Sequence, residues 1–166
     1  MHSILAEHPE EFRYLILALH RQGNRQLNAM FSELGLTSSQ AEAIEIVGTH
    51  GPMSTREVGE YLICESGSPS RLLATLSAKR MTITSQSNQD KRATLHALTR
   101  KGRETLQEIN TLKTSFQEKL TDVLAQASDK HPDDVLSLLA SLLEDPDLTA
   151  AIKRRFPHVF EHLTTP

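Results

Sequence analysis

The sequence is poor in the residues that reinforce small exported folds. Its 166 residues include one cysteine, Cys64, no tryptophan and only 4% aromatic residues. A single cysteine cannot form an intramolecular disulfide, which argues against a disulfide-rich secreted domain. No apolar run approaches the roughly 18–20 residues that span a bilayer, and the first residues lack the basic and apolar segments of a signal peptide. We therefore expect a soluble, cytoplasmic protein without a membrane partner.

Motifs of catalysis and of cofactor binding are equally scarce. We find no Gly-rich phosphate loop, no nucleophile elbow and no isolated pair of carboxylates in a suitable setting. His158 to His162 have the H-x-x-E-H pattern of some zinc peptidases. Only four residues follow His162 in this sequence, so we expect no later carboxylate to complete the three protein ligands of a catalytic zinc. The sequence therefore predicts no enzyme, no metal site and no cofactor.

The charge of the chain is unevenly distributed. The whole sequence has 18 Lys and Arg against 21 Asp and Glu, a net charge of −3. Between Ser54 and Arg103, nine cations meet four anions, so this segment carries +5 and the rest of the chain carries −8. A basic middle on an acidic body is the electrostatic pattern of polyanion binding. The length fits one domain, residues 1–166, because domains commonly have about 100–200 residues.

Most of the chain has the apolar spacing of amphipathic helices, with hydrophobic residues three, four or seven positions apart. Thr37 with Gln40, and Ser54 with Glu57, form two capping boxes, in which paired side chains satisfy unpaired backbone N–H groups at a helix start. Gly35 ends the helix that precedes them. The helices expected in this half of the chain are residues 9–34, 37–50 and 54–62.

A fourth helix is expected after a turn-rich segment that ends at Ser68 and Pro69. Serine can cap a helix, and proline fits the first turn because its missing N–H costs nothing there. Leu72, Leu73 and Leu76 form the inward stripe of this helix. The opposite face is small and polar, which suits close approach to another surface. It carries Ser70, Arg71, Ala74, Thr75 and Ala78.

The pattern then changes from helix to strand. Residues 82–85 and 93–98 are compatible with strands and flank a polar, turn-rich tip at 86–91, which predicts a hairpin. Thr99 caps a long helix, another helix follows Pro132, and a short one is expected at 147–155. We expect the apolar residues of the helix after Pro132 to point inward. They are Val135, Leu138, Leu139, Leu142 and Leu143.

The predicted fold is mainly α-helical with a small β-hairpin wing. Residues 37–103 form a winged helix-turn-helix, and residues 1–36 and 104–166 supply flanking helices. An exposed helix with small residues fits the major groove of DNA, about 12 Å wide, while a cation on the hairpin tip, Arg92, can enter the neighbouring minor groove. The residues that we expect to contact DNA are Ser54, Thr55, Arg56, Ser68, Ser70, Arg71, Thr75, Lys79, Arg92, Arg100 and Lys101.

Four short runs of residues, in this order and spacing, carry a resemblance to a known family. They are Val58 to Leu62, Ser70-Arg71-Leu72-Leu73 with Leu76, Asp90-Lys91-Arg92-Ala93, and Leu98-Thr99-Arg100-Lys101-Gly102. Over about residues 37–105 the chain resembles the MarR family of bacterial transcription regulators. The resemblance implies a homodimer, formed by the first and the last two helices, on a pseudo-palindromic operator. It also implies repression, usually relieved by a small ligand or an oxidant.

The same resemblance places Ser70 and Arg71 on the Ser-Arg pair of the recognition helix, and Asp90 and Arg92 on the Asp-x-Arg of the wing. Asp90 either orients Arg92 for the minor groove or only pairs with it inside the hairpin. Ser54 has an adequate explanation as a helix cap alone. Cys64 lies just before the recognition helix and is either a redox sensor or a small buried hydrophobe.

Two positions depart from the family pattern. Arg80-Met81 stand where the family commonly has Gly-Leu, so we expect the helix end to lack the usual left-handed glycine. Thr84-Ser85 stand where the first wing strand usually has an arginine, so the wing is less basic. With the acidic total charge, this leaves an alternative function open. The chain would then be a winged-helix dimer that serves as a protein-interaction or ligand-binding module without operator binding.

Overall fold

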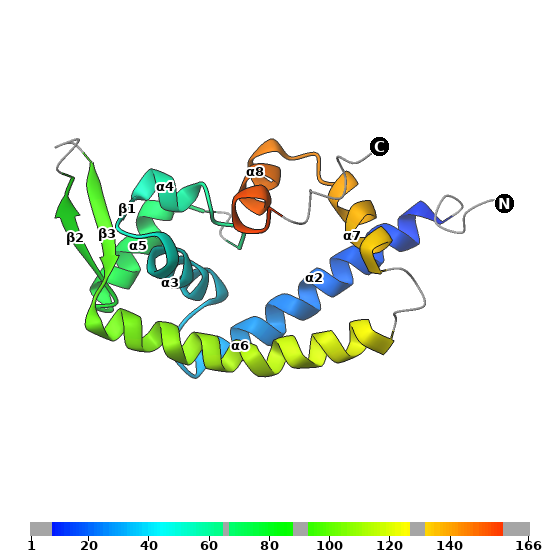
Figure 1. Cartoon of the computed structure of the whole chain (residues 1–166), viewed down its shortest axis with the longest axis horizontal. Coiled ribbons are helices and arrows are strands. Elements are labelled where there is room, and N and C mark those ends of the chain that lie inside the picture. Colours follow the sequence, from blue (N-terminus) through cyan, green and yellow to red (C-terminus); the bar gives the residue numbers. More distant parts are fainter. Residues whose placement is uncertain (1–7, 65–66, 88–92, 127–131, 158–166) are drawn as a thin grey trace. The chain divides into compact units, whose positions relative to one another are not determined.

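The computed structural model describes residues 8–64, 67–87, 93–126 and 132–157 (Figure 1). The chain divides into two compact units, residues 1–38 and 39–166. The first unit contains α2 (Pro9–Ser32), which begins with Pro9 and has Glu10 and Glu11 in its first turn. Proline fits this turn, and the carboxylates stabilise the positive end of the helix. Gly35 follows with φ 65°, so the predicted first helix and its glycine terminator are confirmed.

The second unit contains the remaining described elements and, apart from β1, they follow the order that the sequence predicts. They are α3 (Ser38–His50), β1 (Met53–Ser54), α4 (Thr55–Gly59), α5 (Pro69–Ala78), β2 (Thr82–Gln86), β3 (Thr94–Leu98), α6 (Arg100–Gln126), α7 (Pro132–Ser141) and α8 (Pro146–Arg155). The predicted fold class, mainly helical with a small β-hairpin wing, is confirmed. Among the described residues, no helix is both long and apolar enough to cross a membrane.

The core of the second unit joins α3, α4, α5 and α6. Ile44, Val58, Leu73, Leu76 and Ile109 have no solvent-accessible surface. Burying side chains of this size contributes about 1.5–3 kcal/mol each. The stripe predicted to hold α5 is therefore buried, and its burial fixes which face of α5 is left outside.

The sheet has three antiparallel strands in the order β1-β3-β2. The hairpin β2–β3 is confirmed, with Thr82 opposite Leu98 and Gln86 opposite Thr94. β1 is a strand that the sequence pattern does not predict, because its two residues are too short to show an alternation. It forms since β3 offers a second edge, on which Met53 pairs with His96. The hairpin tip from residue 88 to residue 92 lies outside the described residues.

The end of α5 has a left-handed residue that is not glycine. Arg80 has φ 60°, its N–H donates to Ser77 O at 2.8 Å, and the N–H of Met81 donates to Leu76 O at 2.9 Å. These two bonds define a Schellman motif, which usually has glycine at the left-handed position. The prediction that this helix end lacks the glycine is correct, yet the left-handed geometry is kept.

Thr99 connects the end of α5 to the start of α6. Its hydroxyl donates to Arg80 O at 2.7 Å and accepts the N–H of Gly102 at 3.0 Å. Thr99 therefore caps α6 as predicted. The same side chain also satisfies a carbonyl at the left-handed residue that ends α5.

The inward orientation predicted for the helix after Pro132 is wrong in the single chain for four of its five residues, whereas Leu143 is half-buried. Val135, Leu138, Leu139 and Leu142 are 49%, 39%, 40% and 53% exposed. Helical spacing shows that these residues share one face, but it does not show what covers that face. Leu120, Val123 and Leu124, near the end of α6, are exposed as well.

Candidate nucleic-acid interface

The outer face of α5 is the centre of the candidate interface. Ser70, Arg71, Ala74 and Ala78 are exposed, as the sequence predicts, whereas Thr75 is half-buried. The hydroxyl of Thr75 donates back to Arg71 O at 3.0 Å, which keeps this side chain close to the helix. Within the described part of the chain, no hydrogen bond or ion pair holds the Arg71 guanidinium. The face therefore offers one unrestrained cation among small side chains.

The start of α5 differs from the prediction in one detail. Ser68 occupies the N-cap position, but its side chain accepts no hydrogen bond from the helix. Its hydroxyl lies 2.6 Å from that of Ser70 instead. The prediction that Ser68 caps the helix is thus wrong, and the reason is competition from a neighbouring hydroxyl. Both hydroxyls lie at the positive end of the helix dipole, where an anion is stabilised.

Three predicted cations meet where α5 ends and α6 begins. Lys101 Nζ donates to Lys79 O at 3.0 Å, and Lys79 Nζ donates to Gln40 Oε1 at 2.7 Å. Arg100 is 89% exposed and pairs with Glu104, with 2.8 Å between Nε and Oε1. Lysine beside the last carbonyls of a helix is stabilised by the helix dipole. The structure therefore places Lys79, Arg100 and Lys101 in one positive region beside α5.

Ser54, Thr55 and Arg56 lie together at the start of α4. Ser54 Oγ accepts the N–H of Glu57 at 3.2 Å, and Glu57 Oε2 accepts the N–H of Ser54 at 2.7 Å. The predicted capping box is therefore confirmed, and accepting the Ser54 N–H lowers the pKa of Glu57. Thr55 Oγ1 lies 3.0 Å from His96 Nε2. Arg56 pairs weakly with Glu60. Its side chain is 88% exposed, so its charge lies in solvent.

The wing residues of the prediction, Asp90 and Arg92, lie outside the described residues. The described part of the wing has an exposed outer strand, in which Ile83 is 59% exposed and Thr84, Ser85 and Gln86 are exposed as well. The H-x-x-E-H segment at 158–162 also lies outside the described part. Within the described part, no group of three or more His, Cys, Asp or Glu residues is placed to hold a metal.

His96 is a residue of this region that the sequence analysis left among the scattered histidines. It lies on the central strand β3 and is 7% exposed, and its loss of solvent lowers the pKa of the imidazole. The inward alternation of His96 and Leu98 on one strand is the signal that predicts this burial. His96 thus belongs to the packing between the wing and α4.

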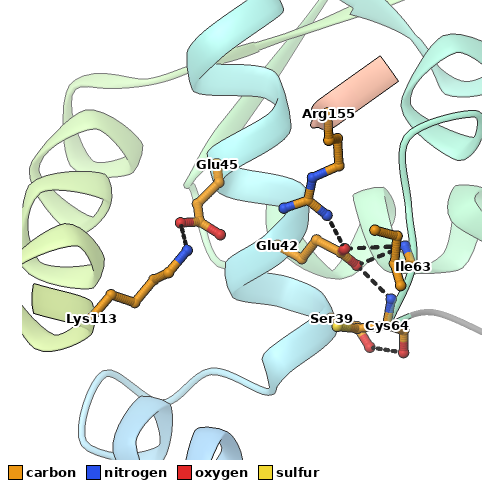
Figure 2. A network of polar contacts seen from close by, with 7 residues as sticks. All are labelled: Ser39, Glu42, Glu45, Ile63, Cys64, Lys113 and Arg155. Atoms are coloured by element: carbon orange, nitrogen blue, oxygen red, sulfur yellow. Dashed lines mark hydrogen bonds and ion pairs between the residues drawn. The ribbon is translucent and has the colours of Figure 1, made fainter. Parts of the chain in front are cut away.

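Glu42 is a second missed residue, and Figure 2 shows its polar network. The residue is 4% exposed, and its carboxylate accepts the N–H of Ile63 at 3.1 Å and of Cys64 at 2.8 Å. The guanidinium of Arg155 donates to the same carboxylate. Nothing in the helical pattern of α3 indicates this role, because the partners come from distant segments.

Cys64 lies in this network, where Ser39 Oγ donates to its carbonyl at 3.0 Å. The residue is exposed, so the alternative of a small buried hydrophobe is wrong. Loss of solvent around the thiol and the neighbouring Glu42 carboxylate raise the pKa of Cys64 to about 11. The thiolate is the reactive form of cysteine, and a pKa this high leaves little thiolate near neutral pH. The redox role of Cys64 stays a prediction that its surroundings do not favour.

Comparisons with known proteins agree with this geometry. Residues 36–102 match the family described as the winged helix DNA-binding domain. The chain is 28% identical over 111 residues to the uncharacterized HTH-type transcriptional regulator YwoH of Bacillus subtilis, covering 65% of this chain and 80% of that protein.

Solved structures show the same fold over most of the chain. S. aureus MepR in its DNA complex has a TM-score of 0.68 at 16% identity, over 79% of this chain and 97% of that one. A MarR transcriptional regulator from Methanosarcina mazei has a TM-score of 0.59 at 17% identity, over 92% of this chain and 96% of that one. Residues 36–102 thus match the winged helix DNA-binding domain, and the chain has the fold of solved MarR-family transcription regulators.

Proposed function

We propose that this protein is a cytoplasmic transcription regulator that binds double-stranded DNA as a homodimer and acts as a repressor. The observation that carries the proposal is the outer face of α5, where an unrestrained Arg71 lies among small side chains while Leu72, Leu73 and Leu76 are buried behind it. YwoH is named as a transcriptional regulator, and the MepR structure contains DNA. Both support a role in reading DNA.

In this proposal each cation has a distinct task. Arg71, with Ser68, Ser70 and Thr75 beside it, contacts base edges in the major groove, because arginine binds guanine through two parallel hydrogen bonds. Arg92 enters the minor groove, with Asp90 orienting it. The remaining residues contact phosphates, which set the position of the protein without reading sequence. They are Ser54, Thr55, Arg56, Lys79, Arg100 and Lys101.

The homodimer accounts for the exposed apolar faces of the helices. In α2, Leu15 and Leu19 are both 61% exposed, and α6 and α7 expose the aliphatic residues described above. Contiguous exposed apolar residues mark interaction surfaces, because burying apolar area is favourable by roughly 25 cal/mol per Å². A second copy of the chain would cover such faces and set the spacing of two α5 helices on a pseudo-palindromic site.

A small-molecule effector has a candidate site beside the wing. A cavity of about 400 Å³ lies between the end of α3, β3 and the first turns of α6. Its walls combine apolar side chains such as Val47, Leu98 and Leu106 with the polar groups of Arg103, Gln107 and Asn110. Small-molecule sites have this composition and occupy about 300–1,000 Å³. We propose that an amphipathic effector bound here changes DNA affinity.

Selection of bound duplexes from genomic fragments tests the function directly. The wild type is expected to enrich related, pseudo-palindromic sites. Arg71→Ala is expected to relax preference at the contacted positions by about 1–3 kcal/mol. Arg25→Ala, which removes an exposed arginine from α2, is the matched control and leaves the preference unchanged. Equal preference in wild type and Arg71→Ala contradicts the assignment of Arg71.

Salt dependence separates DNA binding from the alternative module. Log affinity for duplex DNA falls linearly with log salt, by about 0.9 per neutralised phosphate. Arg100→Ala is therefore expected to lower the slope by about 1 without changing the preferred sequence. If no duplex is bound even at low salt, the protein-interaction or ligand-binding module is the better explanation.

A further inference from the structure

The helix α8 ends in two arginines that contact the winged-helix region. Arg154 Nη1 donates to Glu60 O at 2.8 Å, and its Nη2 lies 3.6 Å from Glu60 Oε2. Arg155 donates to the buried carboxylate of Glu42 (Figure 2). Glu60 follows α4 directly. Glu42 accepts the backbone N–H groups of Ile63 and Cys64, which come shortly after Glu60 in the chain. Both arginines therefore act on the connection between α4 and α5, defined here as residues 60–64.

The connection is held mainly through the charge of Glu42. Its two carboxylate oxygens accept the N–H groups of Ile63 and Cys64. Arg155 is only 18% exposed at its side chain, so it faces Glu42 in a region with little water. Removing one partner of a buried ion pair is strongly destabilising, because the remaining charge is left without compensation. Arg155 thus compensates the charge of the carboxylate that accepts both backbone N–H groups.

The packing around α8 is incomplete, which makes the polar contacts of these two arginines important for holding the helix. Ala151 is 2% exposed, so α8 has an apolar anchor. Beside it, however, a groove of about 820 Å³ is lined by α8 on one wall, and by α4, residues Leu62 and Ile63, and Pro69 on the other. Apolar contact between α8 and the start of α5 is therefore discontinuous. The guanidinium groups of Arg154 and Arg155 therefore supply contacts between α8 and residues 60–64 that close apolar packing does not supply.

We propose that α8 is a positioning element for the recognition helix. Through Arg155 and Arg154 it fixes the connection from α4 to α5, and thereby the orientation of the outer face of α5. The consequence for DNA rests on the proposed function, whereas the fixing of the connection does not. Arg155 is a positioning residue in this proposal, since it lies behind the interface and acts through Glu42.

Amide hydrogen exchange on the full-length protein tests the fixing of the connection without DNA. Arg155→Gln is expected to speed exchange at the Ile63 and Cys64 amides about tenfold, which corresponds to about 1.4 kcal/mol of local opening. Arg155→Lys, which keeps the cation, is expected to restore most of the protection. Lys153→Gln, in the same last turn of α8, is the matched control and leaves exchange at both amides unchanged.

Affinity for a selected duplex tests the consequence for α5. Arg155→Gln is expected to bind about tenfold more weakly, with Arg155→Lys close to the wild type and urea unfolding still cooperative. Unchanged exchange at Ile63 and Cys64 overturns the proposal, and so does weaker binding without faster exchange, because Arg155 would then act on DNA itself. If Arg155→Gln does not fold, amide exchange and duplex affinity of Arg154→Gln decide whether the proposal holds. If the wild type binds no duplex, the proposed function fails, while faster exchange still supports the fixing of the connection.

Discussion

Replacing Arg80 with glycine tests the left-handed residue that ends α5. Arg80 is exposed and has φ 60°, a conformation that costs a residue with a side chain roughly 1–2 kcal/mol. Glycine avoids this cost but gives the unfolded chain more freedom, which returns about 0.4–1 kcal/mol. The expected net stabilisation is about 0.5–1 kcal/mol. For a chain of this length, that corresponds to a rise in Tm of roughly 1–4 °C.

Thermal and urea unfolding measure the effect, and Arg80→Ala is the matched control. Alanine removes the same charge but keeps Cβ, so the left-handed strain remains. The Schellman hydrogen bonds to Ser77 O and Leu76 O are available to both variants, since they use backbone groups only. Arg80→Gly is expected to exceed Arg80→Ala by about 1 kcal/mol. Equal stability of the two variants would refute the assignment of strain to Arg80.

Three further predictions concern packing, pH and thiol chemistry. A Cβ added at Gly102 would lie well inside van der Waals contact of the Met81 carbonyl oxygen, so Gly102→Ala is expected to lose about 1–3 kcal/mol in urea unfolding. Gly23→Ala, with open space around it, is expected to gain about 0.5–1 kcal/mol, and a loss there would contradict the comparison. Burial lowers the pKa of His96 below the ordinary value of about 6.5. The stability that His96 contributes is therefore present above about pH 6.5 and is lost as the pH falls through the pKa of the folded state. Unfolding of wild type and His96→Gln between about pH 7.5 and pH 5 checks this, and identical pH slopes argue against it. Maleimide labelling of Cys64 is expected to rise steadily with pH toward its pKa of about 11, whereas a plateau near neutral pH would show a reactive thiolate.

The helices and the wing were predictable because their signals are local. The Ser54 and Glu57 capping box is formed as the sequence indicates, and Leu73 and Leu76 are fully buried. The outer face of α5 follows from the same spacing, since a helix that buries one stripe exposes the opposite one. This is the part of the candidate site that sequence reasoning places correctly.

The features that were missed depend on distant partners. Glu42 and Arg155 are 113 positions apart, and no periodicity connects them. β1 exists only because β3 has an open edge, and the aliphatic face of α7 gives no sign of what covers it. Ser68 has the residue type of a helix cap, but its hydroxyl bonds to the neighbouring Ser70 hydroxyl instead of to the helix backbone. In each case the outcome is set by a competitor or a neighbour that the local pattern does not contain.

The junction at Thr99 also has a mechanical consequence. α6 has 27 residues and is therefore about 40 Å long, at about 1.5 Å per residue. A tilt of about 5° at one end of such a rod displaces the other end by roughly 3–4 Å. One hydroxyl joins the first turn of α6 to the left-handed residue after α5, so a tilt of α6 would be passed to the end of α5. In the proposed homodimer, α6 would convert a small change at its far end into a new separation of the two α5 helices.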